Sequence, residues 1–161
     1  MKNLLGYIGL VMVLSLTSCG ECRKIECEND GFCSDGECIC TKWYSGESCE
    51  LSYNRNYVGT YYGALDIENG VELRTTDSLS FTSGSKPNSL ECEFGFELEF
   101  VSDSVLVIPA QELNTTTTTI LYEGTGKYHS GYLNFSYDQT DLNSGEVKHV
   151  SFEGQRYDKE G

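Results

Sequence analysis

Six cysteines crowd into a short stretch near the N terminus, and they constrain the fold more than any other feature of the chain. A stretch this short buries too little apolar surface to hold a core of its own. Disulfides replace the core in small exported domains, and each typically contributes about 2–4 kcal/mol. Six cysteines permit fifteen pairings, and their spacing alone does not choose among them. The six are Cys22, Cys27, Cys33, Cys38, Cys40 and Cys49.

The residues between these cysteines resemble an epidermal-growth-factor-like (EGF-like) domain. Asn29-Asp30-Gly31 stands where that family has an Asn-Gly-Gly turn, Cys38-x-Cys40 matches its close pair, and Tyr44-x-Gly46-x-x-Cys49 matches its closing turn. Trp43 departs from the family, because a glycine is common at that position. The resemblance covers residues 22–50 and implies the disulfides Cys22–Cys33, Cys27–Cys38 and Cys40–Cys49.

Residues 1–18 resemble the signal peptide of a bacterial lipoprotein. Lys2 precedes the apolar run LLGYIGLVMVL, which has the length of a signal-peptide core. A membrane-spanning helix takes about 20 apolar residues, so this run is too short to be one. Leu16-Thr17-Ser18-Cys19 resembles a lipobox, which implies that Cys19 is diacylated and becomes the new N terminus, with residues 19–21 as a linker. The alternative is an ordinary signal peptide cleaved near the same point.

From Tyr53 onward the sequence has the pattern of an all-β domain. Residues 90–101, LECEFGFELEFV, alternate between apolar and mostly acidic side chains, which predicts a strand with one buried face. Gly95 is a candidate bulge, or a bend between two shorter strands. The buried face is expected to hold Leu90, Cys92, Phe94, Phe96, Leu98 and Phe100.

The other strands of this half are expected around this one and joined by tight turns. A hairpin turn is predicted at Glu68-Asn69-Gly70, and the Thr-rich stretch NTTTTTILYEG is predicted to be one strand. Seven or eight short strands without a helix predict an antiparallel meander over residues 53–158. Closure into a small barrel removes exposed edges, and a two-sheet sandwich is the alternative.

Three stretches of this half resemble the small lipocalin-like β-barrel domains of secreted Bacteroidetes lipoproteins. They are NYVGTYYG, SVLVIPAQ and GTGKYHSGYLNFSY. Such domains often follow an EGF-like module behind a lipobox. The matching stretches are scaffold features without catalytic residues, so the resemblance implies a fold and a location in the cell envelope. That location is the outer membrane of a Gram-negative bacterium.

The charge of the chain excludes some partners. It has 25 Asp and Glu against 11 Lys and Arg, a formal net charge of −14. Such a charge argues against binding nucleic acid or anionic lipid headgroups, because both are themselves negative. The alternating strand carries Glu91, Glu93, Glu97 and Glu99 on its polar face. Successive positions lie about 7 Å apart, so we expect a solvated outer face and no calcium site.

Few residues offer chemistry. Cys92 is left over once Cys19 is lipidated, and we expect a buried, unreactive thiol. If Cys19 is not lipidated, Cys19–Cys92 is the alternative. His129 and His149 are the only histidines, and His129 shares the stretch HSGYLNF with Ser130, Tyr132 and Asn134, which we expect at the surface or the barrel rim. No catalytic or phosphate-binding motif is present, so we expect no catalytic residues, cofactor or metal ligands.

The leading hypothesis is a non-enzymatic, lipid-anchored envelope protein whose EGF-like stalk presents an acidic barrel for binding or spacing. Its partner would be a protein or a glycan. The alternative is a lipocalin-like carrier of a small apolar ligand, and a hydrolase is the third hypothesis. A cavity lined by inward aromatic side chains favours the carrier, whereas filling of the barrel by Phe94, Phe96, Leu98 and Phe100 counts against it. A histidine and a carboxylate converging in a cleft would favour the hydrolase.

Overall fold

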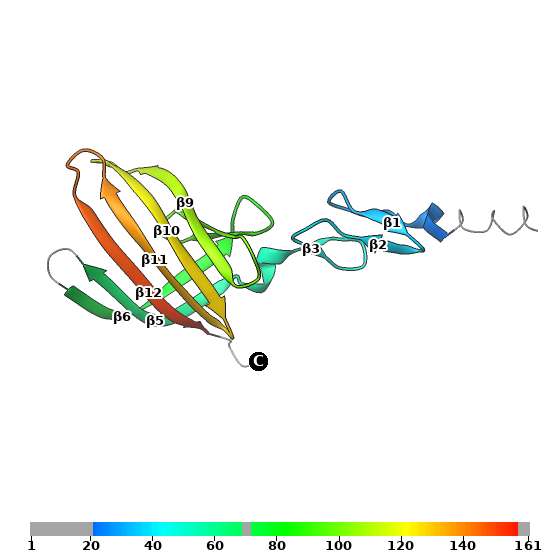
Figure 1. The fold of residues 1–161 in the computed structure, drawn as a ribbon, viewed down its shortest axis with the longest axis horizontal. Helices are drawn as coiled ribbons and strands as arrows, with labels where there is room; N and C mark the ends of the chain where they lie inside the picture. The colour runs from blue at the N-terminus through cyan, green and yellow to red at the C-terminus, as the bar shows by residue number, and fades with distance from the viewer. Residues whose placement is uncertain (1–20, 69–71, 158–161) are drawn as a thin grey trace, which may run out of the picture. The chain divides into compact units, whose positions relative to one another are not determined.

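The computed structural model of the protein describes residues 21–68 and 72–157 (Figure 1). This part of the chain is all-β apart from two short 3-10 helices. It forms two compact units, which divide between Tyr53 and Asn54. The predicted signal peptide, the predicted lipidation site Cys19, and Asn69 and Gly70 of the predicted hairpin turn lie outside the described residues.

Three disulfides hold the first unit together, and they join the same pairs that the resemblance implies. The unit contains the 3-10 helix η1 (Glu21–Lys24), a hairpin of β1 (Phe32–Ser34) and β2 (Glu37–Ile39), and a second pair of strands, β3 (Tyr44–Ser45) and β4 (Leu51–Ser52). Cys49 is the one fully buried residue between positions 22 and 53. The disulfides therefore stand in for a hydrophobic core. They are Cys22–Cys33, Cys27–Cys38 and Cys40–Cys49.

Trp43 occupies a backbone position that suits glycine. Its φ is 75°, in the left-handed region that side chains with a Cβ avoid. The indole packs edge-on against the ring of Tyr53 at 4.9 Å between centroids, and the ammonium of Lys42 lies 4.3 Å from its ring centre. These two contacts offset the strain at a position where EGF-like domains commonly have glycine.

The second unit is a closed barrel of eight antiparallel strands, which follows the short 3-10 helix η2 (Tyr53–Asn56). Each strand pairs with the next along the chain, and β12 pairs with β5 to close the barrel. The prediction of an antiparallel meander closed into a barrel is confirmed. The strands are β5 (Gly59–Glu68), β6 (Glu72–Ser83), β7 (Ser89–Cys92), β8 (Glu97–Phe100), β9 (Val105–Asn114), β10 (Thr119–His129), β11 (Tyr132–Asp141) and β12 (Val147–Arg156).

The alternating stretch 90–101 is a hairpin and not one strand. Gly95 has a φ of 91°, and the N–H of Gly95 donates to the carbonyl oxygen of Cys92 at 2.7 Å. The chain therefore reverses at Gly95, so that of the two options for this glycine the bend is correct. Phe94 falls in the turn with 49% of its surface exposed, whereas Phe96 is fully buried. The prediction that Phe94 shares the buried face is wrong.

The Thr-rich stretch is also divided. Asn114 ends β9, and the strand β10 begins only at Thr119. Between them the N–H of Thr115 donates to the carbonyl oxygen of Thr118 at 2.8 Å, and the Thr115 hydroxyl accepts from the N–H of Thr118 at 3.0 Å. A hydroxyl that bonds to the nearby backbone competes with strand pairing, which explains why the prediction of one continuous strand is wrong here.

Candidate binding surface

The interior of the barrel is filled by side chains. Phe96 lies among aromatic rings, with its centroid 5.1 Å from that of Tyr122 and 5.0 Å from that of Tyr137. Leu98 and Phe100 are fully buried as well. Burial raises the pKa of Tyr137 and of Tyr122 above the ordinary value of 10.0, as expected for phenols removed from water. This packing counts against a carrier with a ligand inside the barrel.

A small pocket lies where β10, β11 and β12 meet the 142–146 turn. Its volume is about 50 Å³, whereas sites for small organic ligands are typically about 300–1,000 Å³. One water molecule takes up about 30 Å³ of liquid volume, so the pocket has room for one or two waters. The residues lining it are Ile120, Gln139, Asp141, Glu146 and Lys148.

A larger groove, of about 450 Å³, lies on the outer face of the barrel, across β5, β12, β11, β10 and the first residue of β9. Outward side chains line it in two rows, whose members stand opposite one another on successive strands. We call it the outer groove. Its first row is Ala64, Glu153, Asn134, Lys127 and Val105, and its second is Asp66, Ser151, Ser136 and Thr125.

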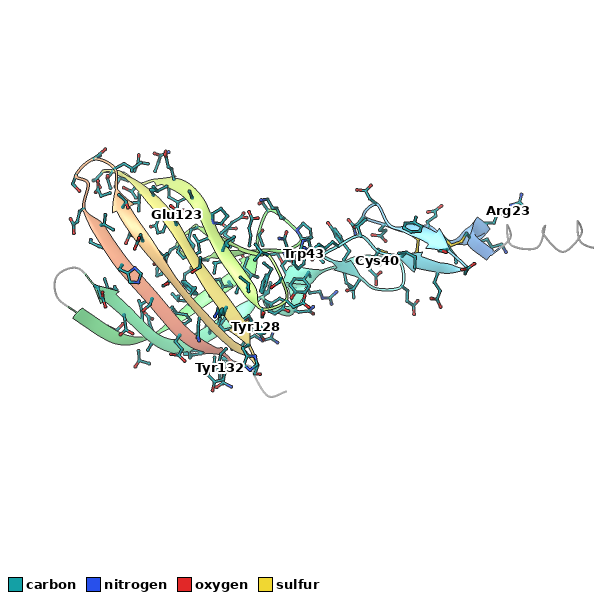
Figure 2. The ribbon with its side chains drawn as sticks, in the orientation of Figure 1. Arg23, Cys40, Trp43, Glu123, Tyr128 and Tyr132 are labelled. Carbon is teal, nitrogen blue, oxygen red and sulfur yellow. A yellow bond between two sulfur atoms is a disulfide. The ribbon has the colours of Figure 1, made fainter. Side chains whose placement is uncertain are left out.

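One flank of the outer groove is rich in exposed tyrosines. The next outward row holds Tyr62, Gln155, Tyr132 and His129, again in direct cross-strand register, and we call it the tyrosine row. Tyr62 and Tyr132 are 53% and 44% exposed. The ring of Tyr157 meets that of Tyr62 edge-on at 5.4 Å, and Tyr157 is 61% exposed. Figure 2 shows Tyr132 at the end of the strands nearest the C terminus.

The other flank is acidic. Its row contains Glu68, His149, Asp138 and Glu123 in register across the same strands, and we call it the acidic row. Nδ1 of His149 lies 2.8 Å from Oδ1 of Asp138, and both side chains are about half exposed. Figure 2 shows Glu123 further along β10 from the Tyr132 end. The second row of the groove, with the short side chains of Ser151, Ser136 and Thr125, lies between the acidic row and the longer Glu153 and Lys127 of the first row.

The structure does not bring the two histidines together. His129 ends the tyrosine row and His149 lies in the acidic row, three rows away, or about 20 Å at about 6.8 Å per row. His149 does meet a carboxylate, but on an exposed sheet face and not in a cleft. Among the residues that the structure describes, no hydroxyl or thiol forms a hydrogen bond with His149. A nucleophile activated by a base, which acyl-transfer chemistry requires, is therefore not assembled around this pair.

Cys92 lies inside the barrel and is not in a disulfide. Burial raises the pKa of its thiol to about 11, and the neighbouring charge of Glu93 acts in the same direction. At neutral pH the group is therefore a thiol and not the nucleophilic thiolate. Its alternative partner, Cys19, lies outside the described residues.

The four glutamates of the 90–101 stretch lie on two strands and their turn. Glu91 stands opposite Glu97, and Glu97 accepts hydrogen bonds from the N–H and the hydroxyl of Ser85 at 3.0 and 2.9 Å. Burial acts to raise the pKa of Glu97, but the hydrogen bonds from Ser85 outweigh it and lower that pKa. Glu99 forms an ion pair with Lys86 at 2.5 Å. Glu97 and Glu99 therefore fasten the loop before β7.

No group of histidine, cysteine, aspartate or glutamate side chains within residues 21–68 and 72–157 is arranged to hold a metal ion. In the first unit, a depression of about 650 Å³ is bordered by Glu26, Glu37 and Glu47.

Sequence reasoning singled out Asn134 of the groove and Tyr132 of its flank but missed the other groove residues. The signal lies in three short stretches, TGK, NFS and SFE, where small or charged residues alternate with inward Gly or Phe. Period-two alternation places the polar members outside. Only the strand register shows that they meet.

Comparison with models of protein families and with curated proteins gives no match for this chain. Within the described part of the chain, no helix has both the length and the apolar character needed to cross a bilayer.

Proposed function

We propose that the protein is a non-enzymatic, lipid-anchored component of the cell envelope whose barrel binds a partner at the outer groove. The observation that carries this proposal is the contrast between the two sides of the barrel wall. The inside is packed with aromatic rings around Phe96, whereas the outside has a groove of about 450 Å³ that is lined by polar side chains together with apolar ones such as Ala64 and Val105. Ligand sites are typically concave, and a few convergent polar groups in them orient the ligand.

The anchor in this proposal is Cys19 of the lipobox-like Leu16-Thr17-Ser18-Cys19. Each buried CH₂ of an acyl chain contributes about 0.8 kcal/mol, so two or three chains hold a protein firmly on a membrane where one does not. Gly20 and Glu21 are the only residues between this cysteine and Cys22, which opens the disulfide-rich unit. That unit acts as an EGF-like spacer between the outer membrane and the lipocalin-like barrel.

Metabolic labelling tests the anchor. Cells that produce the full chain are fed a radioactive fatty acid, and wild type is compared with Cys19→Ala. We expect the label to be lost in Cys19→Ala, and the protein to leave the membrane fraction. Cys92→Ala is the matched control, because Cys92 is the other cysteine outside the three disulfides, and this variant should keep both label and location. Absence of label from the wild type would sink the lipoprotein proposal.

Native mass spectrometry tests the location of binding. Protein purified from its own host is sprayed without denaturation, and its mass is compared with that of the chain alone. A small apolar molecule that stays bound until the barrel unfolds would support the carrier and count against binding on the outer face. We expect the wild type to retain a polar partner. We expect this partner to be lost when Asn134 and Ser151 in the groove are replaced by leucine.

A further inference from the structure

We infer that the outer groove binds an uncharged glycan chain, with Tyr132 and Tyr62 stacked against two of its sugar rings. This inference rests on the proposed function, because it assigns a ligand class to the same groove. Three features of the barrel support it: the spacing of the tyrosines, the mixture of donors and acceptors beside them, and the way the strands and charges exclude other ligands.

The tyrosine row offers stacking surfaces at a spacing that suits linked sugars. Tyr132 and Tyr62 both stand opposite Gln155, one on each side of β12. Neighbouring strands lie about 4.8 Å apart, which puts the two tyrosines about 10 Å apart. That distance is close to the length of two linked pyranose rings. The electron-rich face of an aromatic ring attracts the C–H groups that line one face of a pyranose.

The groove next to this row matches the hydroxyl groups of a sugar. A sugar hydroxyl both donates and accepts hydrogen bonds, so its site must supply acceptors and donors together. Glu153 supplies acceptors, Lys127 supplies donors and Asn134 supplies both, side by side in the first row. Ser151 and Ser136 face each other in the second row and add hydroxyl groups.

The paired strands exclude a peptide bound as an added strand. Such a peptide needs an unpaired strand edge, whose N–H and C=O groups it can bond. β10, β11, β12 and β5 are each paired on both sides beneath the groove, because β9 covers one end of the set and β6 the other. A ligand here must therefore bind side chains and not backbone.

The charge around the groove excludes an acidic glycan. Asp66 and Glu153 line the groove, and the acidic row runs along its flank on a chain of net charge −14. These carboxylates repel sulfate, phosphate and uronic acid groups. An apolar ligand would leave the polar side chains of the groove without water, which costs free energy. An uncharged glycan meets neither penalty.

A glycan array and titrations test the inference. The full mature chain is applied to an array that carries uncharged oligosaccharides, such as cellohexaose, mannohexaose and N-acetylated chitohexaose, beside sulfated and uronic acid glycans. The strongest ligand is then titrated against each variant by calorimetry. We expect binding to an uncharged glycan, and a loss of affinity of about 2- to 12-fold for Tyr132→Ala and for Tyr62→Ala, the range that single aromatic contacts give.

Phe94→Ala is the matched control, because Phe94 is an aromatic residue of similar exposure that lies in the β7–β8 turn and not in the groove. It should leave the affinity unchanged. Nitrogen-15 spectra of the same variants show whether the barrel is intact. Failure to bind any uncharged glycan, stronger binding to an acidic glycan, or equal affinity of wild type and the two tyrosine variants would each overturn the inference.

These outcomes are separable from failure of the proposed function. A chain that is acylated at Cys19 and holds a protein partner at the groove, with loss of that partner in Asn134→Leu, would overturn the glycan assignment alone. A chain that binds the glycan through the two tyrosines but carries no acyl group would overturn the anchor alone.

Discussion

Two phenylalanines, Phe94 and Phe96, stand two residues apart in an alternating stretch, yet the structure gives them opposite environments. Phe96 is fully buried inside the barrel, and Phe94 is half exposed in the β7–β8 turn. Replacement of each by alanine therefore tests whether the chain reverses at Gly95. A continuous strand would make the two substitutions equally costly.

The expected cost at Phe96 follows from what its ring contacts. Burial of a phenylalanine side chain contributes about 1.5–3 kcal/mol. Each aromatic pair adds about 0.5–1.5 kcal/mol, and Phe96 forms three, with Tyr122, Tyr137 and Phe135. Measured losses for buried Phe→Ala substitutions are about 3–5 kcal/mol, because a cavity remains. We expect Phe96→Ala to lower the free energy of unfolding by that amount, and Phe94→Ala to lower it by less than about 1 kcal/mol.

Urea denaturation of the full chain, followed by circular dichroism, measures both losses. With a slope of about 2 kcal/mol per molar urea, Phe96→Ala should lower the midpoint by about 1.5–2.5 M and Phe94→Ala by less than about 0.5 M. A small domain has only about 5–15 kcal/mol of stability, so Phe96→Leu serves as a milder second variant. Equal shifts at the two positions, or a larger one at Phe94, would refute the hairpin.

Three further predictions concern other positions of the barrel. Burial raises the pKa of Tyr61 and of Tyr137 above 10.0, so their contribution to stability is complete below pH 10.0 and declines as pH rises through it. An ultraviolet titration should show these two tyrosines, together with Tyr122, whose pKa is also raised, ionising after the exposed ones. One uniform transition would contradict this. A Cβ at Gly63 would overlap the carbonyl oxygen of Glu153. Gly63→Ala should therefore lower the free energy of unfolding by about 1–3 kcal/mol and the melting temperature by at least about 4 °C. An unchanged melting temperature would count against this close approach of β5 and β12. Hydrogen bonds to Asp141 lower its pKa below 3.8. Wild type should therefore be more stable than Asp141→Asn at neutral pH, and should lose that advantage as pH falls below 3.8. A stability difference that persists in strong acid would show that the ionised carboxylate is not its cause.

The fold was largely predictable because its signals are local. Crowded cysteines indicate a cross-linked module wherever they occur, and alternating side chains indicate strands. The errors arose where one residue changed the local geometry. Gly95 reverses the chain without breaking the alternation, and the Thr115 hydroxyl replaces strand pairing by a turn. At Trp43 the residue type does not indicate the backbone geometry, because its φ of 75° is a conformation that suits glycine.

The outer groove was not predictable in the same way, because no segment contains it. Glu153 faces Ala64 on one side and Asn134 on the other, and these residues are separated by 89 and 19 positions in the chain. Whether they meet depends on the register of two strand pairs, β11–β12 and β12–β5, and the second of these closes the barrel. A shift of one residue in any pair would turn the polar side chains to the inside. The alternation of side chains within one strand does not show which residues of the neighbouring strand lie opposite.

The packed interior and the groove depend on each other. Phe135 and Phe152 face inward, opposite one another, with ring centroids 5.5 Å apart. Their backbones form part of the groove floor, and the outward neighbours of Phe135 and Phe152 are the polar side chains that line the groove. Each aromatic ring thus fixes the backbone from which a polar side chain projects. A ligand then finds those side chains already in place, and less entropy is lost on binding. A barrel hollow enough to carry a ligand inside would give up this support, so the filled core favours the proposed site on the outer face over a site inside the barrel.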